Sequence, residues 1–109
     1  MRLKIFVSVS LVILFFACSK KSTLIDLSTC DPDVSYNGQV KSIIANSCAK
    51  SGCHNGSADP TLLDYASVFA NAARIKSSVM NGSMPKNSSL SSTDKQALLC
   101  WIQNGAKWN

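Results

Sequence analysis

The sequence has few of the side chains from which most active sites are built. Its 109 residues include one histidine, His54, and only six acidic residues. There is no paired carboxylate motif, no Ser-His-Asp set and no glycine-rich phosphate loop, and one histidine cannot be both a metal ligand and a general base. The 11 basic residues do not form runs interleaved with aromatics, so we expect no nucleic-acid partner. These absences argue against an enzyme.

Long apolar runs are also scarce, and the only extended one lies at the start of the chain. Ile5–Phe16 spans about a dozen residues, too few for a stable transmembrane helix. It follows the basic residues Arg2 and Lys4 and ends in Ala17-Cys18. A small residue before a cysteine at the end of such a run resembles a bacterial lipoprotein cleavage site. An ordinary signal peptide with a cysteine near its end is the alternative.

The lipoprotein resemblance implies three segments. We expect residues 1–17 to be a signal peptide, Cys18 to carry the lipid and 18–29 to be a polar tether. The mature protein would then lie at the periplasmic face of a membrane, with the outer membrane as the default. Removing Arg2 and Lys4 lowers the formal charge from +5 to about +3, which is weak evidence for an anionic partner.

Cysteine is the one reactive residue that is plentiful, with five in the chain, and this number favours an oxidising compartment. Lipid on Cys18 leaves four. Cys48 and Cys53 flank four residues, and His54 follows the second directly. The order Cys…Cys-His is typical of covalent haem attachment, in which both thiols bond to the porphyrin and the imidazole binds the iron. The usual run has two residues between the cysteines, so the wider spacer is a departure.

Haem on Cys48 and Cys53 would leave Cys30 and Cys100 to form a disulfide. Two disulfides without haem, in any of three pairings, are the first alternative. A zinc site built from Cys48, Cys53, His54 and a fourth cysteine is the second, although thiols in an exported protein tend to oxidise.

Helical spacing of apolar residues predicts two helices in the first two thirds of the domain. Residues 36–47 place Val40, Ile43, Ile44 and Ser47 on one stripe. Asp64 can cap a helix that begins near Tyr65. Its expected apolar side comprises Tyr65, Val68, Phe69 and Ala72. Residues 73–80 either continue this helix or form another.

The final helix is predicted by a capping box with Thr93 as N-cap and Gln96 three positions later. It should end at Gly105, and its expected core face comprises Leu98, Trp101 and Ile102. Cys100 lies on roughly the opposite side, so it should point away from the core. A segment running over the outside could reach it there, which favours the Cys30–Cys100 pairing.

We therefore expect an all-α domain at residues 30–109, with short helices and long polar loops at 50–60 and 83–89. Such a domain has little aliphatic core and needs a disulfide, a metal or a covalent cofactor to fold stably.

The second iron ligand cannot be a histidine of this chain, because His54 is the only one. Met80 and Met84 are the methionines available in the mature chain. Met80 falls in a helical pattern and is expected in the core. Met84 lies in a polar loop before Pro85, where an apolar thioether has little reason to be unless it binds something. We favour Met84.

These features together resemble small class I c-type cytochrome domains, and most of all the lipoprotein cytochromes with wider cysteine spacing of Bacteroidetes-type bacteria. The resemblance covers about residues 30–108. Its most specific elements are Ser47-Cys48 to Gly56, Ser83-Met84-Pro85, and Trp101-Ile102 with Gly105-Ala106.

The resemblance implies a small cytochrome c-like helical fold in which the first and last helices cross and the loops surround a covalent haem. Cys48 and Cys53 would form the thioether bonds to haem c, and His54 and Met84 would bind the iron from opposite faces. The protein would carry single electrons between redox partner proteins. The alternatives are a disulfide-stapled, cofactor-free interaction module and a haem enzyme or gas sensor in which Met84 is not bound.

Overall fold

The computed structural model describes residues 25–109, and within them it contains helices and no strands, so the all-α prediction is confirmed. The expected signal peptide, the lipid site Cys18 and tether residues 18–24 lie outside the described residues. No helix in the described part is long and apolar enough to cross a membrane.

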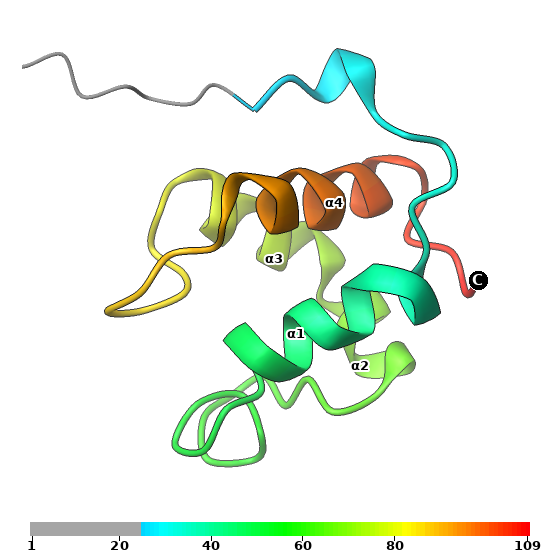
Figure 1. The fold of residues 1–109 in the computed structure, drawn as a ribbon. Coiled ribbons are helices and arrows are strands. Elements are labelled where there is room, and N and C mark those ends of the chain that lie inside the picture. Colours follow the sequence, from blue (N-terminus) through cyan, green and yellow to red (C-terminus); the bar gives the residue numbers. More distant parts are fainter. Residues whose placement is uncertain (1–24) are drawn as a thin grey trace, which may run out of the picture.

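Six helical segments follow one another along the described chain. Their bounds are η1 Leu27–Thr29, η2 Tyr36–Val40, α1 Lys41–Ser47, α2 Tyr65–Ala70, α3 Ala72–Met80 and α4 Ser92–Gln103. Figure 1 shows α4 between the N-terminal segment on one side and α1, α2 and α3 on the other. The loop after α1 and the loop between α3 and α4 lie at the same end of the molecule (Figure 1). This end is where the candidate site forms.

The first predicted helix is present as η2 running directly into α1, so that residues 36–47 form one helical stretch. Val40, Ile43 and Ile44 are buried, as their spacing predicts. The Ser35 hydroxyl accepts a hydrogen bond from the Gly38 N–H at 2.9 Å and caps the stretch.

The second predicted helix divides into α2 and α3 at Asn71. Asp64 caps α2 through a complete capping box with Ser67, which confirms the predicted start. Val68 and Ala72 of the predicted apolar side are buried, whereas Phe69 of the same side is 51% exposed. Asn71, at a φ of −105° and a ψ of 9°, departs from helical geometry and separates the two helices.

The last helix begins earlier than the sequence predicts. Ser91, not Thr93, is the N-cap, and its hydroxyl accepts the Asp94 N–H at 3.1 Å. The helix thereby gains two residues. It ends at Gln103 with Asn104 as C-cap, and Gly105 follows at a φ of +104°, a left-handed conformation that favours glycine.

A disulfide joins Cys30 to Cys100 and confirms the expected pairing. Cys100 is nevertheless only 1% exposed, because the N-terminal segment covers the outer side of α4. Three amide side chains of α4 and its C-cap hold that segment through backbone carbonyls. Gln96 donates to Asp26 at 2.9 Å, Gln103 to Leu27 at 3.0 Å and Asn104 to Asp31 at 3.1 Å. Residues 25–29, expected in the tether, therefore lie against the domain.

An aromatic cluster fills the end of the core opposite the two loops. Tyr36 contacts Tyr65 and Trp101, with ring centroids 5.2 and 5.6 Å apart. The Tyr65 hydroxyl donates to the Ala106 carbonyl at 2.8 Å, and Trp101 Nε1–H donates to the Lys107 carbonyl at 3.0 Å. The chain after α4 is also held against the start of the first helix, where the Tyr36 N–H donates to Oδ1 of Asn109 at 2.9 Å.

Candidate functional site

The candidate site begins where α1 ends. The Cys48 N–H donates to the Ile44 carbonyl at 2.9 Å and completes the last helical turn. The chain then folds back, so that the His54 N–H donates to the Cys48 carbonyl at 3.0 Å. Gly52 has a φ of +77° within this turn, a conformation that a side chain disfavours. The local backbone thus holds Cys48 and His54 side by side despite the four-residue spacer.

The imidazole of His54 is held in one orientation by the backbone. Its Nδ1 lies 2.7 Å from the carbonyl oxygen of Pro60. A carbonyl can only accept, so Nδ1 donates its hydrogen, and Nε2 is the nitrogen that carries the lone pair in the neutral ring. The Leu62 N–H donates to the His54 carbonyl at 2.8 Å and fixes the residue itself. This is the arrangement that metal-binding histidines use to present Nε2 to a metal.

The two methionines differ in their surroundings. Met84 is half-buried, and its N–H donates to the Ser78 carbonyl at 3.1 Å, which attaches the loop to α3. Met80 is 54% exposed, so the prediction that it lies in the core is wrong. Ile75 and Val79 lie on the buried side of α3. Met80 is one position after Val79, so its side chain lies further around the helix, on the exposed side.

Two adjoining cavities bring the predicted site residues together. The inner cavity has a volume of about 110 Å³ and the outer cavity about 760 Å³. Cys48, His54, Asp59 and Met84 line both. Cys53 lines only the outer cavity, as do the tip residues of the second loop. The combined space falls in the size range of small-molecule and cofactor sites.

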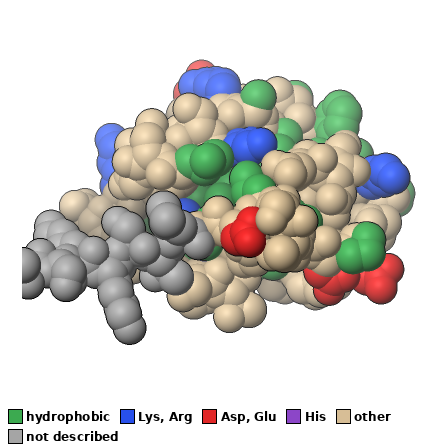
Figure 2. Space-filling model, turned by 90° about the horizontal axis from the view of Figure 1, so that it is seen from above, with side chains coloured by type: hydrophobic (Ala, Val, Ile, Leu, Met, Phe, Trp, Pro, Cys, Tyr) green, Lys and Arg blue, Asp and Glu red, His purple; other side chains and the backbone are tan. Residues whose placement is uncertain are grey.

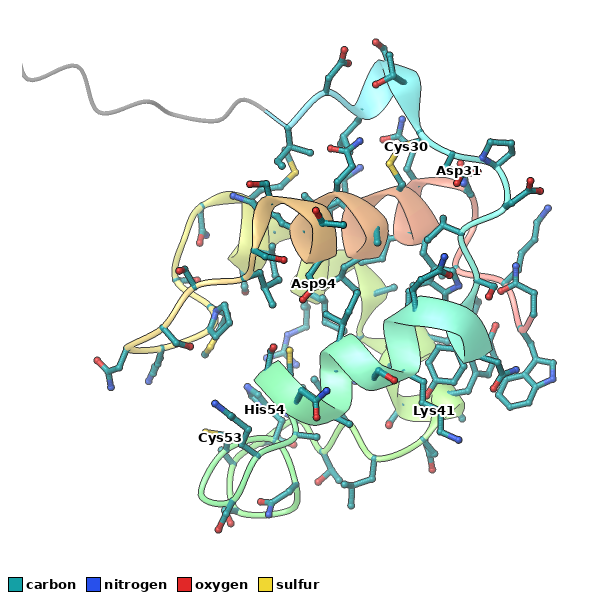
Figure 3. The ribbon with its side chains drawn as sticks, in the orientation of Figure 1. Cys30, Asp31, Lys41, Cys53, His54 and Asp94 are labelled. Atoms are coloured by element: carbon teal, nitrogen blue, oxygen red, sulfur yellow. A yellow bond between two sulfur atoms is a disulfide. The ribbon has the colours of Figure 1, made fainter. Side chains whose placement is uncertain are left out.

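Both site cysteines are free thiols. Cys48 is half-buried, whereas Cys53 is exposed, and Figure 3 shows Cys53 and His54 on the same loop. Burial raises the pKa of the Cys48 thiol above its ordinary value, and the negative charge of an ionised Cys53 adds to the effect. Within residues 25–109 the structure bonds Cys30 to Cys100 and leaves Cys48 and Cys53 unbonded.

The side chains at the site fit a haem iron better than a zinc ion. No three His, Cys, Asp or Glu side chains of the described residues are grouped so that they could hold a metal ion, which leaves the zinc alternative without support. A haem iron needs only two axial ligands from the protein, here an imidazole with a free Nε2 and a thioether. Cys48 and Cys53 would hold the porphyrin. These residues fit that group because one pair of cavities joins them.

Sequence reasoning missed the contribution of α3. Asn71, Arg74 and Ser78 line the inner cavity beside the apolar Ile75 and Val79. Their spacing of three and four positions places them on one helix face. That spacing is visible in the sequence, but the polar residues in it resemble an ordinary solvated face.

Searches of protein-family models, curated protein sequences and solved structures find no match to this chain. The chemistry of Cys48, Cys53, His54 and Met84 is therefore the ground for the functional proposal.

Proposed function

We propose that the protein is a c-type cytochrome that carries single electrons. Haem c would be attached through Cys48 and Cys53, with His54 and Met84 as the iron ligands. The observation that carries the proposal is that Met84, from the loop after α3, lines the same cavities as Cys48 and His54 from the loop after α1. Met84 is far from Cys48 and His54 in the sequence, so the fold brings these residues to the same cavities.

The chain's own residues favour electron transfer over chemistry at the metal. The Pro60 carbonyl accepts from Nδ1 of His54 and orients the ring, which leaves Nε2 as the nitrogen available to iron. The soft thioether of Met84 would favour the reduced state of the iron that it binds. Bound haem would supply an iron that gains and loses one electron. If His54 and Met84 both bind the iron, no position would remain there for a substrate, and we propose no enzymatic activity.

Apolar side chains would shield the site from water on one side. Leu62, Ile75 and Val79 line the inner cavity and are buried. Cys53 is exposed at the outer cavity, so electrons would enter and leave at that edge. Figure 2 shows charged side chains of both signs spread over the face seen from above, with no block of one sign.

The expected membrane attachment is part of the proposal. Lipid on Cys18 would place the carrier at the periplasmic face of the outer membrane, where redox partner proteins exchange electrons with it. Mass spectrometry of the protein from bacterial membranes tests the lipid, and a mature chain without a lipidated Cys18 contradicts it.

Absorption spectroscopy of the purified protein tests the haem and its ligands. We expect a c-type haem spectrum that persists after denaturation, because thioether bonds survive unfolding. We also expect a methionine–iron charge-transfer band. Met84→Ala should abolish that band, and Met80→Ala should leave it unchanged because Met80 is exposed away from the site. Loss of the band in Met80→Ala instead would overturn the ligand assignment.

The remaining outcomes separate the alternatives. A protein expressed with a functioning haem-attachment system but free of covalent haem contradicts the proposal and favours the cofactor-free module stapled by Cys30–Cys100. Covalent haem without the methionine band in the unmodified protein favours the haem enzyme or gas sensor, since one axial position would then be open.

A further inference from the structure

We propose that Phe69 and Trp108 bind the surface of a lipid bilayer, with their rings at the level of the headgroups. This inference rests on the proposed lipid anchor at Cys18 and adds a second, noncovalent contact with the same membrane. The contact determines which end of the domain faces away from the bilayer.

Two large aromatic side chains are exposed at one end of the domain. Phe69 is 51% exposed and Trp108 is 63% exposed. Both rings contact the half-buried ring of Tyr65, with centroids 5.7 and 4.9 Å from it. The Tyr65 hydroxyl donates to the Ala106 carbonyl at 2.8 Å, so the ring between them is fixed. We call Tyr65, Phe69 and Trp108 the aromatic patch.

The chemistry of the aromatic patch suits the boundary between a membrane and water. Tryptophan is enriched at that boundary, because its ring is apolar while its indole N–H can reach the wet headgroups. The buried Trp101 donates its indole N–H to the Lys107 carbonyl at 3.0 Å. Within residues 25–109 the indole N–H of the exposed Trp108 has no such acceptor, so it is free for a headgroup oxygen.

The short connection to the lipid site brings the aromatic patch within reach of the membrane. Residues 18–24, about 25 Å when fully extended, separate the lipid site from the described chain. The chain is held to α4 at Asp26, whose carbonyl accepts from Gln96 at 2.9 Å. Gln96 lies about 12 Å along the helix axis from the C-cap Asn104. The aromatic patch contacts the chain just beyond that end, so the tether is long enough.

A bilayer fits the aromatic patch better than a second copy of this chain does. Half-exposed Phe and Trp side chains offer on the order of 200 Å² together, far below the roughly 800 Å² per partner of a stable protein interface. A bilayer requires no matching shape, and its affinity for a protein follows the apolar area inserted. The lipid anchor also keeps the domain at a high local concentration beside the membrane, where a weak contact suffices.

The charged side chains at this end allow the contact with a neutral bilayer. Lys107 directly precedes Trp108, and Lys41 begins α1 at the same end of the molecule (Figure 3). Both are exposed, and lysine stems can lie along apolar surface while their charges stay in water. Asp64, the N-cap of α2, offsets one of these charges. We therefore expect binding to zwitterionic phosphatidylcholine without a need for anionic lipid.

Binding through the aromatic patch orients the candidate site. Figure 1 shows the C-terminus at the end of the molecule away from the two loops that line the outer cavity. With the aromatic patch on the bilayer, the exposed edge at Cys53 faces away from it. Redox partners would then approach that edge without obstruction by the membrane.

Fluorescence of the full-length, lipidated and haem-loaded protein in phosphatidylcholine vesicles tests this. Bromine atoms on the acyl chains quench only rings that enter the bilayer, so tryptophan emission should be roughly twofold lower than in unbrominated vesicles. Quenching by haem is the same in both kinds of vesicle and cancels in this ratio. Trp108→Phe should remove the difference, because the remaining Trp101 is only 1% exposed.

Phe69→Gln should shift the ratio toward one, because Trp108 would lie less deeply in the bilayer without the second ring. Met80→Gln is the matched control, since Met80 is 54% exposed but lies at the end of α3, outside the aromatic patch. Its ratio should equal that of the unmodified protein, and a change as large as that in Phe69→Gln would overturn the assignment to the aromatic patch.

Two further results would overturn the inference in different ways. Equal emission in both kinds of vesicle, from protein that mass spectrometry shows to be lipidated at Cys18, would overturn the membrane contact and leave the anchor and the electron carrier in place. Chemical cross-linking of two copies, abolished by Phe69→Gln, would then assign the aromatic patch to a dimer. Absence of lipid on Cys18 would instead remove the proposed anchor, and this inference with it.

Discussion

Two tyrosines of the aromatic cluster, in contact with each other, have different roles. Tyr65 donates a 2.8 Å hydrogen bond to Ala106, whereas Tyr36 is 4% exposed and its hydroxyl makes no hydrogen bond within the described residues. Burial raises the pKa of Tyr36 above its ordinary value of 10.0, and the nearby carboxylate of Asp64 adds to the shift.

Stability should therefore fall at high pH through Tyr36. Unfolded Tyr36 loses its proton near its ordinary pKa of 10.0, while the folded protein holds the proton to higher pH. Its stabilising contribution is complete below that value and is lost as the pH rises above it. Tyr36→Phe should flatten the decrease in the free energy of unfolding between about pH 9 and about pH 11, measured by urea denaturation.

Tyr65→Phe should act at neutral pH, unlike Tyr36→Phe, which should act at high pH. It removes the hydrogen bond to Ala106 and should lower the free energy of unfolding by about 1 kcal/mol at neutral pH.

The free energy of unfolding of Tyr36→Phe could instead decrease at high pH as steeply as that of the unmodified protein. That result would show that Tyr36 is not the source of the decrease.

The sequence predicts which residues form the site, but it does not predict which backbone groups hold their side chains. The spacing of Cys48, Cys53 and His54 points to one chemistry, and the odd placement of Met84 in a polar loop points to a ligand. The acceptor for His54 is the carbonyl of Pro60, a group that every residue has. No side-chain pattern can identify it.

At the scale of helices, the start of α4 depends on a residue that pattern reasoning passed over. Ser91 accepts the Asp94 N–H, whereas Thr93 lies inside the helix. Ser91→Ala should lower the free energy of unfolding by about 1 kcal/mol. Thr93→Ala should change it by much less, and equal losses in urea denaturation would contradict the assigned cap.

The periodicity of apolar residues predicts that the helices exist, whereas local hydrogen bonds determine where they begin and end. Buried Val40, Ile43 and Ile44 repeat with helical spacing, so the first helix was predictable. Ser91 and Thr93 are both acceptable caps in sequence, and the choice depends on which hydroxyl meets an unpaired N–H. The division at Asn71 also involves a local hydrogen bond that apolar spacing does not reveal, because Asn71 Nδ2 donates to the Ser67 carbonyl at 2.8 Å.

For the molecule as a whole, the Cys30–Cys100 disulfide closes most of the described chain into one loop. The two cysteines are 70 positions apart. Replacing both with alanine should lower the free energy of unfolding by about 4 kcal/mol, because the unfolded chain regains the freedom that the loop removes. Urea denaturation measures this loss. Reducing agent should destabilise the unmodified protein and leave the double variant unchanged, and sensitivity of the double variant would contradict the assignment.

The pairing was predictable, and the burial that accompanies it was not. Helical phase places Cys100 away from Leu98 and Ile102, as the sequence indicates. The cover that buries it comes from residues 25–31, of which the sequence predicts 25–29 only as a tether. That segment is held by amides of α4 through backbone carbonyls and by one covalent bond.

The same bond determines how the domain responds to mechanical force. A pull applied at residue 25 acts first on the few hydrogen bonds between residues 25–29 and α4, which can break one after another. It then reaches Cys30, where the load passes through sulfur to the buried Cys100 in the last turn of α4. Force from the N-terminal side is therefore delivered directly to the last helix, and the loops that line the cavities lie outside its path.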